Sequence, residues 1–145
     1  VAAHGWFRPD APLFSGFQLE DGPFLTADVY DLDLRASLVA LSACETGRSV
    51  IGGGGELPGL SRAFLYAGAA ALLVSQWRVD DLSTAELMTR FYAELAGGAP
   101  PPSALRAAQL AILTGDMAQN DRAHPFFWAG FQVIGAAGGV ARGAR

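Results

Sequence analysis

The sequence contains no lysine, a single cysteine and few charged residues. Each of these shortages excludes a kind of site, bond or partner. All ten basic residues are arginine, so a Schiff-base lysine and a P-loop lysine are both excluded. The arginines are scattered, without the basic run that would predict contact with nucleic acid. One cysteine cannot form an internal disulfide, which favours a reducing, cytoplasmic environment.

Long hydrophobic runs are absent as well. No apolar stretch approaches the length of a membrane span and no signal peptide is visible, so we expect no membrane contact. The 145 residues are 51% hydrophobic and 17% charged, a composition typical of a globular domain with its own core. The chain begins with "VAAHG" and has no initiator methionine, so we expect a piece of a longer protein.

Short apolar runs alternate with helical patterns along the chain, which predicts an α/β domain with a mostly parallel sheet flanked by helices. We assign this domain to residues 1–138 and expect a flexible tail over 139–145. The first strands of the sheet should lie upstream of residue 1. The predicted strands are the end of a strand at 1–4, buried strands at 38–42 and 70–75, and a final strand at 127–135.

Turn and capping residues mark the other elements. The Asp21–Gly22 pair predicts a small hairpin. Thr26 is the expected cap of a short helix, Ser83 and Glu86 have the spacing of a capping box, and Ser103 is the expected cap of a helix that ends near Gly115. A further helix should begin near Glu56, with Pro58 in its first turn, and end at Gly68.

The reactive side chains follow two of the predicted strands. Cys44 comes just after the strand at 38–42, and His4 ends the strand at the start of the chain. In open parallel sheets ligands bind beyond the carboxyl ends of the strands, and an imidazole near a thiol promotes the nucleophilic thiolate. The backbone N–H groups of Gly5 and Cys44 would then bind an oxyanion. From the sequence pattern alone, a structural role is the alternative for both residues, with Cys44 as a small buried hydrophobic side chain and His4 as a structural histidine.

Six segments together resemble the CHAT domain, the caspase-like peptidase domain often attached to tetratricopeptide repeats. They occur in the expected order over nearly the whole chain: "AAHG", "LSACETG", "GLSRAFLYAGAAALLVSQWRVDD", "LMTRFYAEL", "ALRAAQLAIL" and "HPFFWAGFQVIG". The resemblance implies a caspase-like three-layer fold and cysteine endopeptidase activity, with His4 and Cys44 as the catalytic dyad. It implies a protein or peptide substrate, tetratricopeptide or other regulatory domains in the full-length protein, and no cofactor or metal.

The same resemblance suggests which residues contact the substrate. Ser42 occupies the position two before the cysteine, where an acid would favour a basic substrate residue, and its neutral side chain does not support that preference. The segment Ser75–Arg78 is similar to one that borders the caspase substrate groove. There Arg78 would contact an acidic side chain, Trp77 would form a pocket wall or pack in the core, and Ser75 and Gln76 would pair with substrate backbone.

Other features favour other readings. The glycine run at 52–55 precedes a helix, as a phosphate cradle does, which keeps a nucleotide- or flavin-binding domain as an alternative. A catalytically silent interaction module with the caspase-like fold is the other alternative. Asp80 and Asp81 lack a histidine partner and are poor metal ligands, and we expect His124 to cap or pack.

Overall fold

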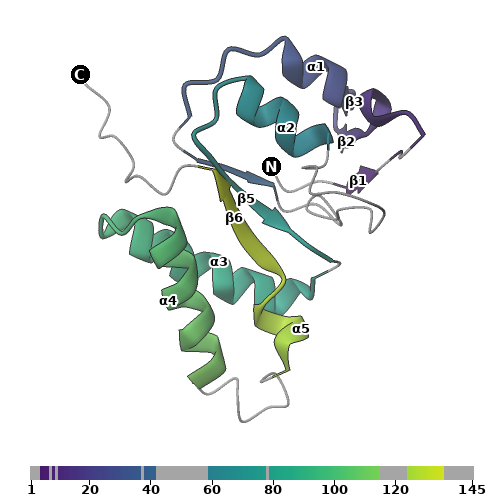
Figure 1. Ribbon diagram of the computed structural model, residues 1–145. Helices are drawn as coiled ribbons and strands as arrows, with labels where there is room; N and C mark the ends of the chain where they lie inside the picture. Colours follow the sequence, from purple (N-terminus) through teal and green to yellow (C-terminus); the bar gives the residue numbers. More distant parts are fainter. Residues whose placement is uncertain are drawn as a thin grey trace.

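A computed structural model describes residues 4–6, 8, 10–36, 38–41, 59–77, 79–114 and 124–135, with the backbone alone at His4 (Figure 1). Within these residues six strands and six helical segments follow one another. In chain order they are β1 (His4–Trp6), the 3-10 turn η1 (Pro12–Phe14), β2 (Gly16–Leu19), β3 (Gly22–Leu25), α1 (Thr26–Tyr30), β4 (Val39–Leu41), α2 (Gly59–Tyr66), β5 (Ala71–Ser75), α3 (Asp81–Ala96), α4 (Pro101–Thr114), α5 (Pro125–Trp128) and β6 (Phe131–Gly135).

Strands β1, β2 and β3 form an antiparallel sheet in that order. The predicted hairpin at Asp21–Gly22 is confirmed, because β2 and β3 join through a tight turn in which Leu19 pairs with Gly22. Gly22 has φ +132°, a conformation that side chains other than glycine rarely adopt. On its other edge β2 pairs with β1, with His4 opposite Gln18 and Gly5 opposite Phe17.

The second sheet has the order β4-β5-β6 and is mixed. Strand β5 runs parallel to β4 and antiparallel to β6, so the expectation of a mostly parallel sheet is wrong for the described strands. The reason lies in the connection between β5 and β6. Helices α3 and α4 pack as a helical hairpin, which returns the chain to the end at which β5 finished. Strand β6 therefore begins with Phe131 opposite Ser75 and runs back along β5.

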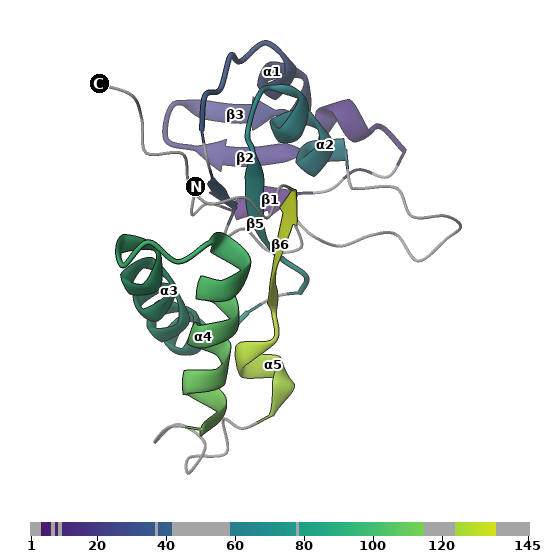
Figure 2. The same ribbon diagram turned by 60° about the vertical axis from the view of Figure 1, so that its left-hand side comes forward.

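This mixed sheet is the middle of three layers. Figures 1 and 2 show α1 and α2 on one side of it and α3 and α4 on the other. All five residues of β5 are buried, as a strand covered on both faces requires. Alternate side chains of β5 point to opposite faces of the sheet, so Leu72 and Val74 pack with α2, whereas Leu73 packs with α3 and α4. The expected three-layer arrangement of helices around a sheet is thus present.

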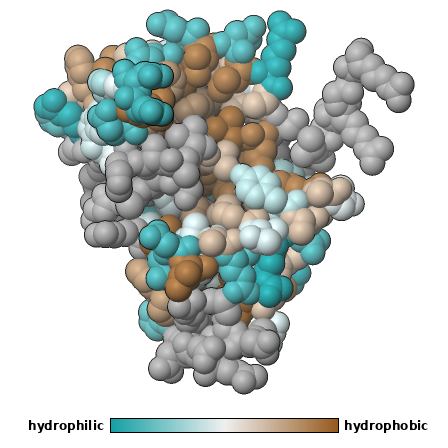
Figure 3. All heavy atoms as spheres, turned by 180° about the vertical axis from the view of Figure 1, so that it is seen from behind, coloured by the Kyte–Doolittle hydropathy of each residue, from teal (hydrophilic) through white to brown (hydrophobic). Residues whose placement is uncertain are grey.

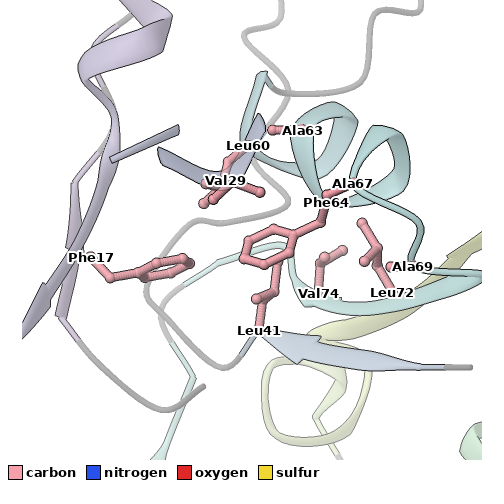
Figure 4. Packing of buried hydrophobic residues seen from close by; sticks show 10 residues of the cluster. All are labelled: Phe17, Val29, Leu41, Leu60, Ala63, Phe64, Ala67, Ala69, Leu72 and Val74. Carbon is pink, nitrogen blue, oxygen red and sulfur yellow. The ribbon is translucent and has the colours of Figure 1, made fainter. Parts of the chain in front are cut away.

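The hydrophobic core on the α2 side also includes the first sheet. Figure 4 shows Phe17 of β2 pointing toward Phe64 of α2, with Leu41 of β4 beside it. The ring centroids of Phe17 and Phe64 are 6.5 Å apart, and the side chains of Phe17 and Leu41 are fully buried. We call this set the α2-side core. Its buried members are Phe17, Val29, Leu41, Leu60, Ala63, Phe64, Ala67, Ala69, Leu72 and Val74.

The helix starts differ from several of the predicted caps. Thr26 lies inside α1, where its hydroxyl donates to the Ser15 carbonyl oxygen (2.9 Å) instead of capping the helix. Helix α4 begins at Pro101, two residues before the predicted cap Ser103, because a proline is well suited to the first turn. The predicted C-terminal glycine of α2 is confirmed, since Gly68 has φ +106° just after the last turn.

Candidate active site

The predicted site residues divide between described and undescribed parts of the chain. His4 and Gly5 lie in β1, Ser75 is the last residue of β5, and Gln76 and Trp77 follow it. The other three predicted residues, Ser42, Cys44 and Arg78, lie outside the described residues, as does the glycine run at 52–55.

Strands β4 and β5 end at the same edge of the mixed sheet. Leu41 is the last residue of β4 and pairs with Val74, the residue before the end of β5. Because the strands are parallel, their carboxyl ends meet at the same edge, where ligands bind in sheets of this kind. Cys44 follows Leu41 by three residues in the sequence, and Ser75 and Gln76 follow Val74 directly.

The strand that carries His4 belongs to the other sheet. Sequence reasoning required the His4 strand to neighbour the Cys44 strand, and among the described strands β1 pairs with β2 and has no ladder with β4. The backbone hydrogen bonds of the described strands therefore do not fix the relation between β1 and β4. Phe17 of β2, which lies opposite Gly5, and Leu41 of β4 belong to the same hydrophobic core, and this packing joins the two sheets instead.

At the end of β5, the backbone groups of Ser75 and Gln76 point toward opposite sides of the strand. The Gln76 N–H donates to the Gly130 carbonyl oxygen (2.8 Å), so this amide faces β6. Because backbone groups alternate along an extended strand, those of Ser75 face the β4 side. The Gln76 side-chain Nε2 also donates to the side-chain oxygen Oε1 of Gln132 (3.4 Å).

Trp77 packs against the start of β6. Its indole N–H donates to the Phe126 carbonyl oxygen (3.2 Å), and a Cβ added to Gly130 would lie 3.2 Å from the same nitrogen and 2.7 Å from Val79. The ring is half-buried, so one part packs and another part faces outward. Sequence reasoning missed the contributions of Phe126 and Gly130, although a glycine just before a strand is a signal of close packing.

Polar groups near these elements have structural partners. The His124 Nδ1 accepts a hydrogen bond from the Phe126 N–H (3.2 Å), which confirms the prediction that this histidine caps or packs. On the loop after β1, the Arg8 guanidinium donates to Asp10 (2.9 Å) and lowers the pKa of that carboxyl below its usual value. Among the described residues there is no cluster of three His, Cys, Asp or Glu side chains able to hold a metal ion. No helix in the same part of the chain is long and apolar enough to cross a membrane.

Comparison with known proteins places the chain in a family. Residues 1–136 match the CHAT domain. Tetratricopeptide repeat protein 28 of Homo sapiens is 37% identical over 112 residues, which are 76% of this chain and 4% of the human protein. Its counterpart in Mus musculus is 35% identical over the same share of each chain. The chain thus spans about 4% of the length of these relatives. With its three-layer α/β fold and a match over nearly its whole length, the chain belongs to the CHAT domain family, a caspase-like family related to peptidases.

Proposed function

We propose that this CHAT domain is a cysteine endopeptidase that hydrolyses peptide bonds in protein substrates with a dyad of His4 and Cys44. The observation that carries the proposal is that both reactive residues are intact in a chain whose residues 1–136 match a caspase-like family. The position of Cys44 supports it, because this residue follows β4 at the edge where β4 and β5 both end.

The chemistry is acyl transfer through a thioester. The Cys44 thiolate attacks the scissile carbonyl carbon, and the negative charge that develops on the oxygen is held by the N–H groups of Gly5 and Cys44. The imidazolium of His4 gives its proton to the leaving amine as the C–N bond breaks. A water molecule then attacks the thioester, His4 takes its proton, and the acid product leaves with Cys44 restored as thiolate.

The substrate would bind along the end of β5. Ser75 and Gln76 would pair with the substrate backbone where the chain leaves the carboxyl end of β5. Gln76 would contribute through its side chain, since its N–H is bonded to Gly130. The exposed part of the Trp77 ring would line a pocket. Ser42 would leave the primary pocket neutral, and Arg78 would favour an acidic substrate residue.

Attached domains would regulate this activity in the cytoplasm. The curated relatives are tetratricopeptide repeat proteins of which the chain matches about 4%, which supports repeats or other regulatory domains as partners in the full-length protein.

A thiol-reactive peptide probe tests the enzyme directly. Cys44 is the only cysteine, so covalent labelling of the chain by an acyloxymethyl ketone peptide reports on it alone. We expect labelling that disappears in Cys44→Ala and falls strongly in His4→Ala, because the imidazole promotes the thiolate. His124→Ala is the matched control, since the other histidine caps α5. Labelling that is indifferent to His4 would contradict the dyad.

A catalytically silent interaction module is the second candidate, and the apolar surface favours it. Several large hydrophobic side chains are exposed, among them Tyr66 (75%), Leu82 (67%) and Phe14 (58%). From behind, Figure 3 shows hydrophobic side chains gathered at the centre of the face. Exposed apolar patches mark interaction sites in soluble proteins. Proteome-wide cleavage mapping with the full-length protein, with Cys44→Ala as control, separates the two candidates, because a silent module produces no cuts that depend on Cys44.

A further inference from the structure

A buried phenylalanine connects the strand that carries His4 to the strand that precedes Cys44. Phe17 lies in β2 directly opposite Gly5, the neighbour of His4, and its side chain is fully buried. In the α2-side core it points toward Phe64, and Leu41 at the end of β4 lies beside them (Figure 4). One side chain thus contacts the core shared by both sheets.

Among the described residues of the first sheet, Phe24 of β3 also packs against the α2-side core, but its side chain is only partly buried. The sheets β1-β2-β3 and β4-β5-β6 share no backbone ladder among the described strands. Most of the first sheet faces outward: along β2, Gly16 and Phe17 are buried whereas Gln18 and Leu19 are exposed, and along β3 every side chain is partly or fully exposed. Phe17 is therefore the one large, fully buried side chain that the described part of this sheet contributes to the core.

We propose that Phe17 is a positioning residue, which sets the distance between the His4 strand and the Cys44 strand by packing between β2 and α2. This proposal rests on the proposed dyad. A rigid aromatic ring in a closely packed core resists small shifts, whereas a smaller side chain lets the first sheet move toward α2. Because proton transfer demands near-contact geometry, a displacement of about 1 Å can cost on the order of a hundredfold in rate.

The core on the other face of the mixed sheet supplies a matched control. Phe91 of α3 is likewise fully buried, and it packs with α4 and β6, away from both β1 and β2. Phe17→Leu and Phe91→Leu remove the same atoms from equally buried positions. A purely structural role would make the two variants behave alike.

The test measures the alkylation of Cys44 by iodoacetamide as a function of pH, together with thermal unfolding. We expect both variants to lower the unfolding midpoint by similar amounts. At temperatures well below either midpoint, Phe17→Leu should slow alkylation at neutral pH by about tenfold or more and shift its pH profile toward that of a free thiol. Phe91→Leu should keep the wild-type profile.

The outcomes separate the two proposals. If His4→Ala slows alkylation and Phe17→Leu does not, the dyad stands and the positioning role of Phe17 is wrong. If Phe17→Leu and Phe91→Leu slow alkylation equally, the effect is general loss of stability and the positioning role is again wrong. If His4→Ala leaves the pH profile of Cys44 alkylation unchanged, the proposed dyad is wrong, and the positioning role of Phe17, which rests on it, is wrong as well.

Discussion

At the residue scale, Gly68 shows how one position constrains the chain between α2 and β5. Its φ of +106° is unfavourable for any side chain, and a Cβ added there would collide with the carbonyl oxygen of Leu34. The chain is held close at this point, because the Leu34 N–H donates to the Ala67 carbonyl oxygen (2.6 Å). Glycine is required here for two separate reasons.

These two reasons can be measured separately with a second glycine. We predict that Gly68→Ala lowers the free energy of unfolding by more than Gly98→Ala. Gly98 has φ +91° with no atom within 4 Å of an added Cβ, so its substitution introduces backbone strain alone, roughly 1–3 kcal/mol. Urea unfolding of both variants gives the difference, which reports the collision with Leu34. Equal losses would mean that the chain relaxes around position 68 without cost.

At the element scale, the start of α3 depends on one aspartate. The Asp80 carboxylate oxygen Oδ2 accepts hydrogen bonds from the N–H (2.9 Å) and from the hydroxyl (2.7 Å) of Ser83. Asp80 is thus the N-cap, and Ser83 is buried in the first turn. We predict that Asp80→Ala lowers the free energy of unfolding by about 1 kcal/mol, the usual effect of losing a cap.

A conservative variant tests the cause of that loss. Asparagine is about as good an N-cap as aspartate, so Asp80→Asn should retain most of the stability in the same urea titration. A loss in Asp80→Asn as large as that in Asp80→Ala would show that the negative charge near the positive end of the helix, and not the hydrogen bonds, stabilises α3.

The same helix shows what the sequence predicted and what it could not. The spacing of Met88, Phe91, Tyr92 and Leu95 predicts an apolar stripe that ends at Gly97–Gly98, and Phe91 is fully buried with Gly97 as the C-cap. Tyr92 is instead 50% exposed, and Leu87, outside the predicted stripe, is buried. The capping box at Ser83 was wrong, because two capping residues, Asp80 and Ser83, lie within one turn and only tertiary structure decides between them. Local signals identify elements well and their first residues poorly.

The direction of β6 and the packing beside the candidate site depend on contacts between residues that are distant in the sequence. The apolar runs of β4 and β5 were predicted correctly as strands, and β5 is fully buried, whereas β4 is fully buried only at Leu41. Apolar runs carry no information on whether β6 runs parallel or antiparallel. That direction follows from the helical hairpin of α3 and α4. Similarly, the spacing of His4 and Cys44 gave no hint of Phe17, whose role depends on a cross-strand pairing with Gly5.

At the scale of the whole molecule, β5 couples the two hydrophobic cores. Leu72 and Val74 belong to the α2-side core, whereas Leu73 belongs to the core beneath α3 and α4, and all are essentially fully buried. If one core loses its contacts with β5, the strand becomes disordered, and the other core then loses its contacts with β5 as well. We therefore predict that the described layers unfold in one cooperative transition.

Substitution on a single face tests this coupling. Leu73→Ala removes contacts from the α3–α4 side alone and should cost about 2–5 kcal/mol. The loss should appear equally in tryptophan fluorescence, which reports on Trp6 in the first sheet and on Trp77 and Trp128 beside β6, and in far-ultraviolet circular dichroism, which is dominated by α3 and α4. Coincident midpoints in both the wild type and the variant are expected. If the variant instead shows helices melting before the fluorescence changes, the cores are separable, and the α2-side core that holds Phe17 and Leu41 would be able to persist without α3 and α4.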